Sequence, residues 1–215
     1  MKETKATTIL ELLTVIAIVA LTTSAIVTIF VSGWRNYGQQ SALTETSERT
    51  KSALATVTTE IRKASRVLES YNFYVGDLCG QHNVKQKQFF AFIPKTFALR
   101  PCQIEAFLTN NSTLVMSMPS LDNNYNIIPN RWDYEVIFLT NSQLKSIKNR
   151  WDGSQYLREE KIIMNNTESV NFSYEPAGSN ITDTERITVT ITTFQPGGGA
   201  TQKTTLTAVA KLRNK

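Results

Sequence analysis

The sequence has few of the residues that usually build a catalytic or metal centre. Its 215 residues include two cysteines, Cys79 and Cys102, and one histidine, His82. Structural zinc sites need about four clustered Cys or His ligands, and no second Cys/His cluster accompanies these three residues. The chain also lacks a glycine-rich phosphate loop and a Ser-His-Asp order. We therefore predict no enzymatic activity, no cofactor and no metal site, although the scattered Asp and Glu residues leave a carboxylate pair open.

Residues that break helices are absent from the first part of the chain. No proline interrupts the run from Ile9 to Val31, no glycine precedes Gly33, and Glu11 is its only ionisable residue. Roughly 20 apolar residues in a helix cross a hydrocarbon core of about 30 Å. Inside a bilayer the backbone must satisfy its own hydrogen bonds. The run therefore predicts a transmembrane helix.

Two lysines set the expected orientation of this helix. Lys2 and Lys5 precede the apolar run, and such residues stay on the cytoplasmic side of a membrane. The chain from Trp34 onward would then lie outside the cytoplasm. One alternative is a cleaved secretory signal peptide, which should have a shorter apolar region and a small-residue cleavage site. A second is an ordinary single-pass anchor, which leaves Glu11 unexplained. A third is a buried core helix, which the length and the flanking lysines disfavour.

The order Lys5-Ala-Thr-Thr-Ile-Leu-Glu-Leu-Leu-Thr-Val-Ile-Ala-Ile-Val-Ala20 resembles the processing and anchor motif of type IV prepilins and pseudopilins. In that family a short basic leader is cleaved after a small residue, and a Glu occupies position five of the mature chain. The resemblance implies that Ala6 ends the leader, Thr7 begins the mature chain and Glu11 is the family glutamate. Ala6 replaces the usual Gly, and Thr7 replaces the usual Phe. The match covers about the first thirty residues.

The resemblance also implies a role for Glu11. Within the family, a glutamate at this position is thought to meet the N-terminal amine of a neighbouring subunit, here the amine of Thr7. An amine and a carboxylate buried together offset each other's desolvation, whereas either alone is costly. Such a pair would set the register in which one subunit docks on the next. The alternative is that Glu11 lies at headgroup depth and is solvated.

The helix is expected to continue beyond the membrane. Trp34, Arg35 and Tyr37 suit an interfacial belt, and residues 39–68 contain no proline and favour helix. Glycines at positions 33 and 38 allow a bend at the junction. Apolar residues recur every three or four positions, which predicts a stripe that packs on a sheet rather than a short coiled-coil seam. The stripe consists of Leu54, Val57, Ile61, Ala64 and Leu68.

Beyond Glu69 the sequence becomes rich in β-branched and aromatic residues. Six short runs predict strands, and antiparallel meander pairing is the simplest topology for them. The loop Gln195–Ala200 predicts a hairpin between the last two. The expected strands are 88–93, 113–118, 133–139, 169–174, 186–194 and 204–212.

These elements together predict an α+β fold, with a long N-terminal helix packed on a mainly antiparallel β-sheet, as in pilins. The expected organisation is a cytoplasmic leader at 1–6, a transmembrane and assembly helix at 7–33, its amphipathic continuation at 34–68 and an extracytoplasmic β-rich domain at 69–215. The order of the late strands, with a segment at 157–164 between them, resembles the larger minor pilins and pseudopilins of the J-type or W-type.

The two cysteines fall in the expected exterior domain. Outside the cytoplasm Cys79 and Cys102 can persist as a disulfide, which would stabilise the fold by roughly 3 kcal/mol. The alternative is two unpaired thiols.

The resemblance implies a non-enzymatic minor pilin or pseudopilin, processed and N-methylated by a prepilin peptidase. It would reside in the cytoplasmic membrane and then in a type IV pilus or a type II secretion-like filament. The expected partners are other pilin subunits, the peptidase and membrane lipid. A single-pass sensor or binding module with a β ectodomain is the alternative. The net charge of +5 and the basic clusters near residues 85–100, 145–150 and 211–215 also leave a DNA-binding minor pilin open, beside a simply solvated basic surface.

Overall fold

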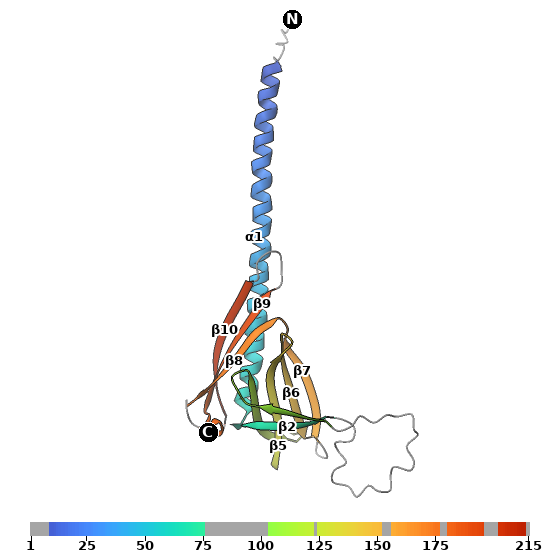
Figure 1. Ribbon diagram of the computed structural model, residues 1–215, viewed down its shortest axis with the longest axis vertical. Helices are drawn as coiled ribbons and strands as arrows, with labels where there is room; N and C mark the ends of the chain where they lie inside the picture. Colours follow the sequence, from blue (N-terminus) through green and yellow to red (C-terminus); the bar gives the residue numbers. More distant parts are fainter. Residues whose placement is uncertain are drawn as a thin grey trace, which may run out of the picture. The chain divides into compact units, whose positions relative to one another are not determined.

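The computed structural model describes residues 9–75, 103–122, 124–151, 156–176, 180–195 and 202–213. It has one long helix, α1 (Ile9–Lys63), and mainly antiparallel strands, which confirms the predicted α+β class (Figure 1). The chain divides into two compact units, Met1–Glu45 and Thr46–Lys215. Ala6 and Thr7, the cysteines Cys79 and Cys102 and the expected strand at 88–93 lie outside the described residues.

In the first unit, α1 is continuous through both glycines. A Cβ atom added at Gly33 or Gly38 would meet no atom within 4 Å, so no close packing requires glycine there. Several hydroxyl groups of this segment donate to backbone carbonyls of the helix itself. The Thr22 hydroxyl donates to the backbone carbonyl of Ile18, and the Thr28 hydroxyl donates to that of Ser24. Each acceptor lies about one helical turn before its donor. Short polar side chains therefore remain compatible with an apolar environment around this helix.

In the second unit, the last turns of α1 bury the predicted apolar stripe. Leu54, Val57 and Ile61 are all buried, whereas Arg62 and Lys63 are exposed on the other side. The buried positions recur at three and four residues, which is one face of a helix. The stripe predicted from the sequence is thus confirmed at these three positions.

The helix ends at Lys63, so the prediction that it continues to Leu68 was wrong. Arg66–Val67 form strand β1, which pairs with β4, and the backbone N–H groups of Ser65 and Leu68 donate to the carbonyls of Ser117 and Val115. The β-branched Val67 is completely buried in this arrangement. Pairing with a long strand satisfies the backbone groups that another helical turn would have satisfied, so local helix propensity is overridden.

A five-stranded antiparallel sheet forms the larger part of the second unit. Its order is β1-β4-β5-β6-β7, with β4 (Thr113–Leu121), β5 (Ile127–Thr140), β6 (Gln143–Trp151) and β7 (Tyr156–Met164). A two-residue turn joins β5 to β6, and both of its residues, Asn141 and Ser142, have positive φ, as tight hairpins require. The predicted strands at 113–118 and 133–139 are confirmed within β4 and β5. The segment 157–164 lies within β7.

A second sheet has three strands in the order β10-β9-β8. These are β8 (Thr167–Glu175), β9 (Arg186–Gln195) and β10 (Gln202–Lys211), with a short 3₁₀ turn, η2 (Ile181–Asp183), between β8 and β9. The predicted pairing of the last two strands is confirmed, with Gln202 opposite Gln195 and Lys211 opposite Arg186.

A third, two-stranded sheet was not predicted. It pairs β2 (Ser70–Val75) with β3 (Gln103–Leu108). The first four residues of β2, Ser-Tyr-Asn-Phe, alternate polar and aromatic residues, which is the signal of a half-buried strand.

Two hydrophobic clusters hold these layers together. The larger joins the stripe of α1 to one face of the five-stranded sheet and to the inner face of the three-stranded sheet, through residues such as Met116, Ile137, Phe172 and Ile191. The smaller, around Phe73, Val115 and Val136, lies where β2 and β3 cover the opposite face of the five-stranded sheet. Because the central strands are buried on both faces, β4 lacks a clear alternation of buried and exposed residues.

Candidate functional site

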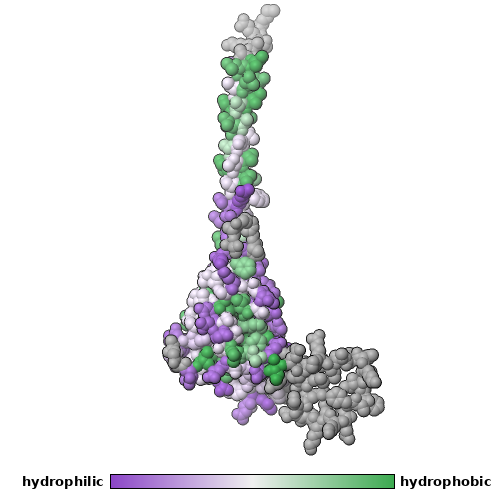
Figure 2. Space-filling model, viewed as in Figure 1, coloured by the Kyte–Doolittle hydropathy of each residue, from purple (hydrophilic) through white to green (hydrophobic). Residues whose placement is uncertain are grey.

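The first candidate site is the apolar segment of α1 from Ile9 to Val31, which Figure 2 shows as a run of hydrophobic side chains. Its large apolar residues point in every direction around the helix axis, and Leu10, Leu13 and Ile16 are more than half exposed. A helix that is apolar on every face needs lipid or other protein around it. Fully covering one large apolar side chain is worth about 1.5–3 kcal/mol.

This segment is long and apolar enough to cross a membrane. None of its most apolar part is buried by the rest of the protein. Within the described residues no other helix meets this description. The segment is therefore a candidate membrane anchor.

Glu11 lies close to the first described residue of this helix. Its side chain is exposed, and its backbone carbonyl accepts a hydrogen bond of 2.8 Å from the Thr14 hydroxyl. The neighbours Leu12 and Leu13 are apolar and more than half exposed. Glu11 is thus one carboxylate on an otherwise apolar helical surface. Ala6 and Thr7, the residues of the predicted cleavage site, lie outside the described residues.

Aromatic residues follow the apolar segment. Trp34 and Tyr37 are 73% and 74% exposed, and the Trp34 ring lies 6.3 Å from the ring of Phe30. Large exposed aromatic side chains at the end of an apolar helix are typical of a membrane–water interface.

In the second unit a partly buried ion network joins the last turn of α1 to the five-stranded sheet. The carboxylate of Glu60 lies 2.9 Å from the Lys63 ammonium and 3.0 Å from the Lys148 ammonium. Lys148 also lies 3.3 Å from Glu135, and the Ser146 hydroxyl donates to Glu135 over 2.5 Å. Lys148 thus bridges a carboxylate of the helix and a carboxylate of the sheet.

Burial and charge shift the pKa values of this network in different directions. Burial raises the pKa of Glu135 above its ordinary value, and the Lys148 charge and the Ser146 hydroxyl offset only part of that rise. Burial opposes the charged form of Lys148, but attraction to Glu135 and Glu60 outweighs it and raises the pKa of Lys148. Burial alone would also raise the pKa of Glu60, but the hydrogen bond from Lys63 and the charge of Lys148 lower it.

The sequence contains a signal for this network that was missed. Glu135 lies inside the apolar run 134–139, and strand alternation places it on the same face as the core residue Ile137. The register sets Lys148 directly opposite Glu135. A charge at a core position of a strand indicates a buried partner, because an unpaired one would be very costly.

The basic cluster near residues 145–150 is largely neutralised by ion pairs. Lys145 lies 3.0 Å from Glu160, and Lys148 belongs to the network above. Arg150 is exposed. The Arg131 guanidinium lies over the ring of Trp151, and its central carbon is 4.2 Å from the centre of that ring.

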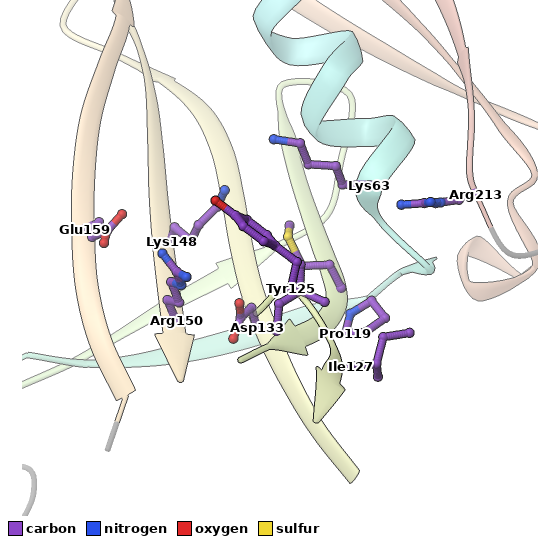
Figure 3. Close-up of a pocket in the computed structure, with 11 residues that line it drawn as sticks. Lys63, Pro119, Tyr125, Ile127, Asp133, Lys148, Arg150, Glu159 and Arg213 are labelled. Atoms are coloured by element: carbon purple, nitrogen blue, oxygen red, sulfur yellow. The ribbon is translucent and has the colours of Figure 1, made fainter. Parts of the chain in front are cut away.

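A pocket of about 810 Å³ opens in the second unit beside the ion network (Figure 3). Side chains from the end of α1, from β4 to β7 and from Arg213 line it. Arg150 and Arg213 supply positive charge, and Tyr125 and Ile127 supply apolar surface. Within the described ranges, no group of three or more His, Cys, Asp or Glu side chains is placed to hold a metal ion.

Comparison with known proteins assigns no relative to this chain: no protein-family model, no curated protein and no solved structure matches it.

Proposed function

We propose that this chain is a minor pilin or pseudopilin, a non-enzymatic structural subunit of a type IV pilus or a type II secretion-like filament. The precursor is held in the cytoplasmic membrane by α1, with the β-rich part outside the cytoplasm. A prepilin peptidase cleaves it between Ala6 and Thr7. The observation that carries the proposal is the segment Ile9–Val31, which is apolar on every face, exposed along its length and interrupted by a carboxylate near its start.

Two physical requirements of this segment support the proposal. Its apolar surface must be covered, and both lipid and the helices of neighbouring subunits can cover it. The Glu11 carboxylate is also costly to move into an apolar environment, and pairing it there with the free amine at Thr7 of a neighbour offsets that cost. A subunit then docks stably only in the register that brings this amine and carboxylate together.

The first test is the mass of the mature protein. In cells that contain a prepilin peptidase, the membrane-extracted chain should lack residues 1–6. The same chain from cells without the peptidase should retain them. An intact N-terminus in both would contradict the proposal.

The second test replaces the glutamate. Glu11→Gln removes the charge and keeps the size, so membrane insertion should be unchanged while incorporation into sheared filaments is lost. Glu48→Gln is the matched control, because Glu48 is an exposed glutamate in the polar part of the same helix. Normal incorporation of the Glu11→Gln protein would remove the register argument.

A membrane-anchored binding module is the second candidate, and the pocket beside Arg150 is the observation that favours it. Such a module would keep residues 1–6 and would need no assembly partners. A DNA-binding role has less support, because Lys145 and Lys148 are already ion-paired. Retention on a DNA column that is lost on raising salt would favour DNA binding instead.

A further inference from the structure

The pocket of the second unit lies on the face of the five-stranded sheet that also packs on α1. Met118, Asp133 and Lys148 share that face, since Met118 pairs with Asp133, and Lys148 pairs with Glu135, two residues further along β5. The pocket lies beside the last residue of α1, Lys63, where the helix no longer covers the sheet. Its volume of about 810 Å³ falls in the range of about 300–1,000 Å³ that is common for binding pockets.

The charged lining leaves two guanidinium groups available. Lys148 and Lys63 are engaged by Glu60, and the Asp133 carboxylate accepts hydrogen bonds from the Ser120 hydroxyl and the Trp151 amide. Arg150 and Arg213 are exposed, and neither side chain has an ion pair within the part of the chain that the structure describes. Glu159 is the remaining carboxylate of the lining.

The other side of the pocket is apolar and unusually exposed. Leu121, Ile127 and Tyr125 are 37%, 64% and 84% exposed. In Figure 3 Tyr125 lies between Lys148 and Arg150 on one side and Pro119 and Ile127 on the other. Large apolar side chains grouped beside unpaired cations are typical of a surface that a partner covers.

Tyr125 is held in its exposed position at a conformational cost. Its φ angle of 63° lies in the left-handed region that bulky residues avoid. The turn around it is fixed by Asp122, whose carboxylate accepts from the backbone amides of Asn124 and Asn126 over 2.8 Å each, and whose carbonyl accepts from the Tyr125 amide. A glycine would adopt this φ without strain, so stability alone does not explain a tyrosine here.

We propose that this pocket binds an acidic segment of a partner protein in which a carboxylate side chain neighbours an apolar or aromatic one. The carboxylates pair with the guanidinium groups of Arg150 and Arg213, which suit bidentate contacts. The apolar side chain packs on Tyr125 and Ile127. Tyrosine and arginine, with tryptophan, are enriched among the residues that dominate the energy of protein–protein contacts. This binding site goes beyond the filament function and does not depend on it.

The test measures binding of labelled peptides to the full chain in detergent by fluorescence anisotropy. The probe is the peptide Asp-Phe-Glu-Leu-Asp. One analogue replaces its acids by Asn and Gln, and another replaces Phe and Leu by Ser. The probe should bind, and each analogue should bind roughly tenfold more weakly or not at all. Equal binding of the neutral analogue, or no binding of the probe, would overturn the proposal.

Variants of the protein locate the binding. Arg150→Gln and Arg213→Gln should each weaken probe binding, whereas Lys211→Gln should not, because Lys211 is exposed on β10 and is not part of the pocket lining. Tyr125→Gly should weaken binding while leaving the melting temperature unchanged or raising it. Unchanged binding in Tyr125→Gly, or competition by inorganic phosphate or a single-stranded oligonucleotide that exceeds competition by unlabelled peptide, would also overturn it.

Discussion

The two stretches of α1 on either side of Glu45 share one secondary structure and have opposite surroundings. Residues such as Leu13 and Ile16 in the first unit are more than half exposed, whereas Val57 and Ile61 in the second unit are completely buried. The first stretch is apolar all round, and the second is apolar on one face. Hydrogen bonding makes both helical, but only the second is stabilised by packing within its own chain. The apolar surface of the first stretch therefore needs lipid or other protein to cover it.

The largest expected effect comes from placing charge in the first stretch. Ile18→Arg with Ala25→Arg puts two cations into the apolar segment, and each costs about 2.5–3.5 kcal/mol at the centre of a bilayer. The double variant should move from the membrane pellet to the soluble or aggregated fraction. Thr59→Arg is the control, because Thr59 is exposed in the second stretch. Retention of the double variant in carbonate-washed membranes would contradict the anchor assignment.

Breaking the ion network should have the next largest effect, confined to the second unit. Lys148→Met leaves Glu135, which is 2% exposed, and Glu60 without their shared cation. Removing one partner of a buried pair typically costs about 3–5 kcal/mol. Urea unfolding should show this loss. Lys145→Met, which removes a more exposed pair with Glu160, should cost about 0–1 kcal/mol.

Matched truncations of isoleucine give the most direct comparison of the two stretches. Ile61→Ala opens a cavity beneath α1 and should lower the free energy of unfolding of the second unit by about 2–5 kcal/mol. Ile16→Ala removes the same atoms from an exposed position and should change it by less than about 0.5 kcal/mol. Equal effects of the two substitutions would show that the first stretch also packs on the chain.

The smallest expected effect is a pH dependence of stability. The folded-state pKa of Lys148 is raised above 10.5, so its stabilising contribution is complete below that pH and is lost as pH rises through the folded value. The folded-state pKa of Glu60 is lowered below 4.5, so its contribution is present above that pH and is lost on acidification. The contribution of Glu135 to stability has the opposite pH dependence to that of Glu60. Because its folded-state pKa is raised, Glu135 favours the folded state only at low pH. Unfolding midpoints measured across pH 10.5 should fall more steeply for the natural chain than for Lys148→Met.

Much of the fold follows from local sequence patterns. The strands β4, β5, β8, β9 and β10 contain runs of β-branched and aromatic residues, and the structure confirms each of them. The helix end was predicted wrongly, because pairing of Val67 with β4 overrides a helical pattern that runs to Leu68. The split of the strands into three sheets was not predicted either, since each sheet depends on which strands meet across long separations in the chain.

The candidate sites also differ in how far the sequence alone could predict them. Glu11 could be singled out from the sequence, because one carboxylate in an apolar run is a local anomaly. The Glu60–Lys148–Glu135 network could not be assembled, because it joins residues from a helix and two strands. The exposed position of Tyr125 depends on a positive φ that Asp122 stabilises, and no periodic pattern indicates such a turn.

The amino-acid sequence by itself determined the apolar helix and its single carboxylate, because a continuous run of apolar residues fixes both its helical backbone and its need for an apolar environment. Only the tertiary structure decided where α1 ends, which carboxylates Lys148 bridges, and that Arg150, Arg213 and Tyr125 line one pocket. These features arise from contacts between residues far apart in the chain. Such contacts stabilise the protein only once the sheets have formed.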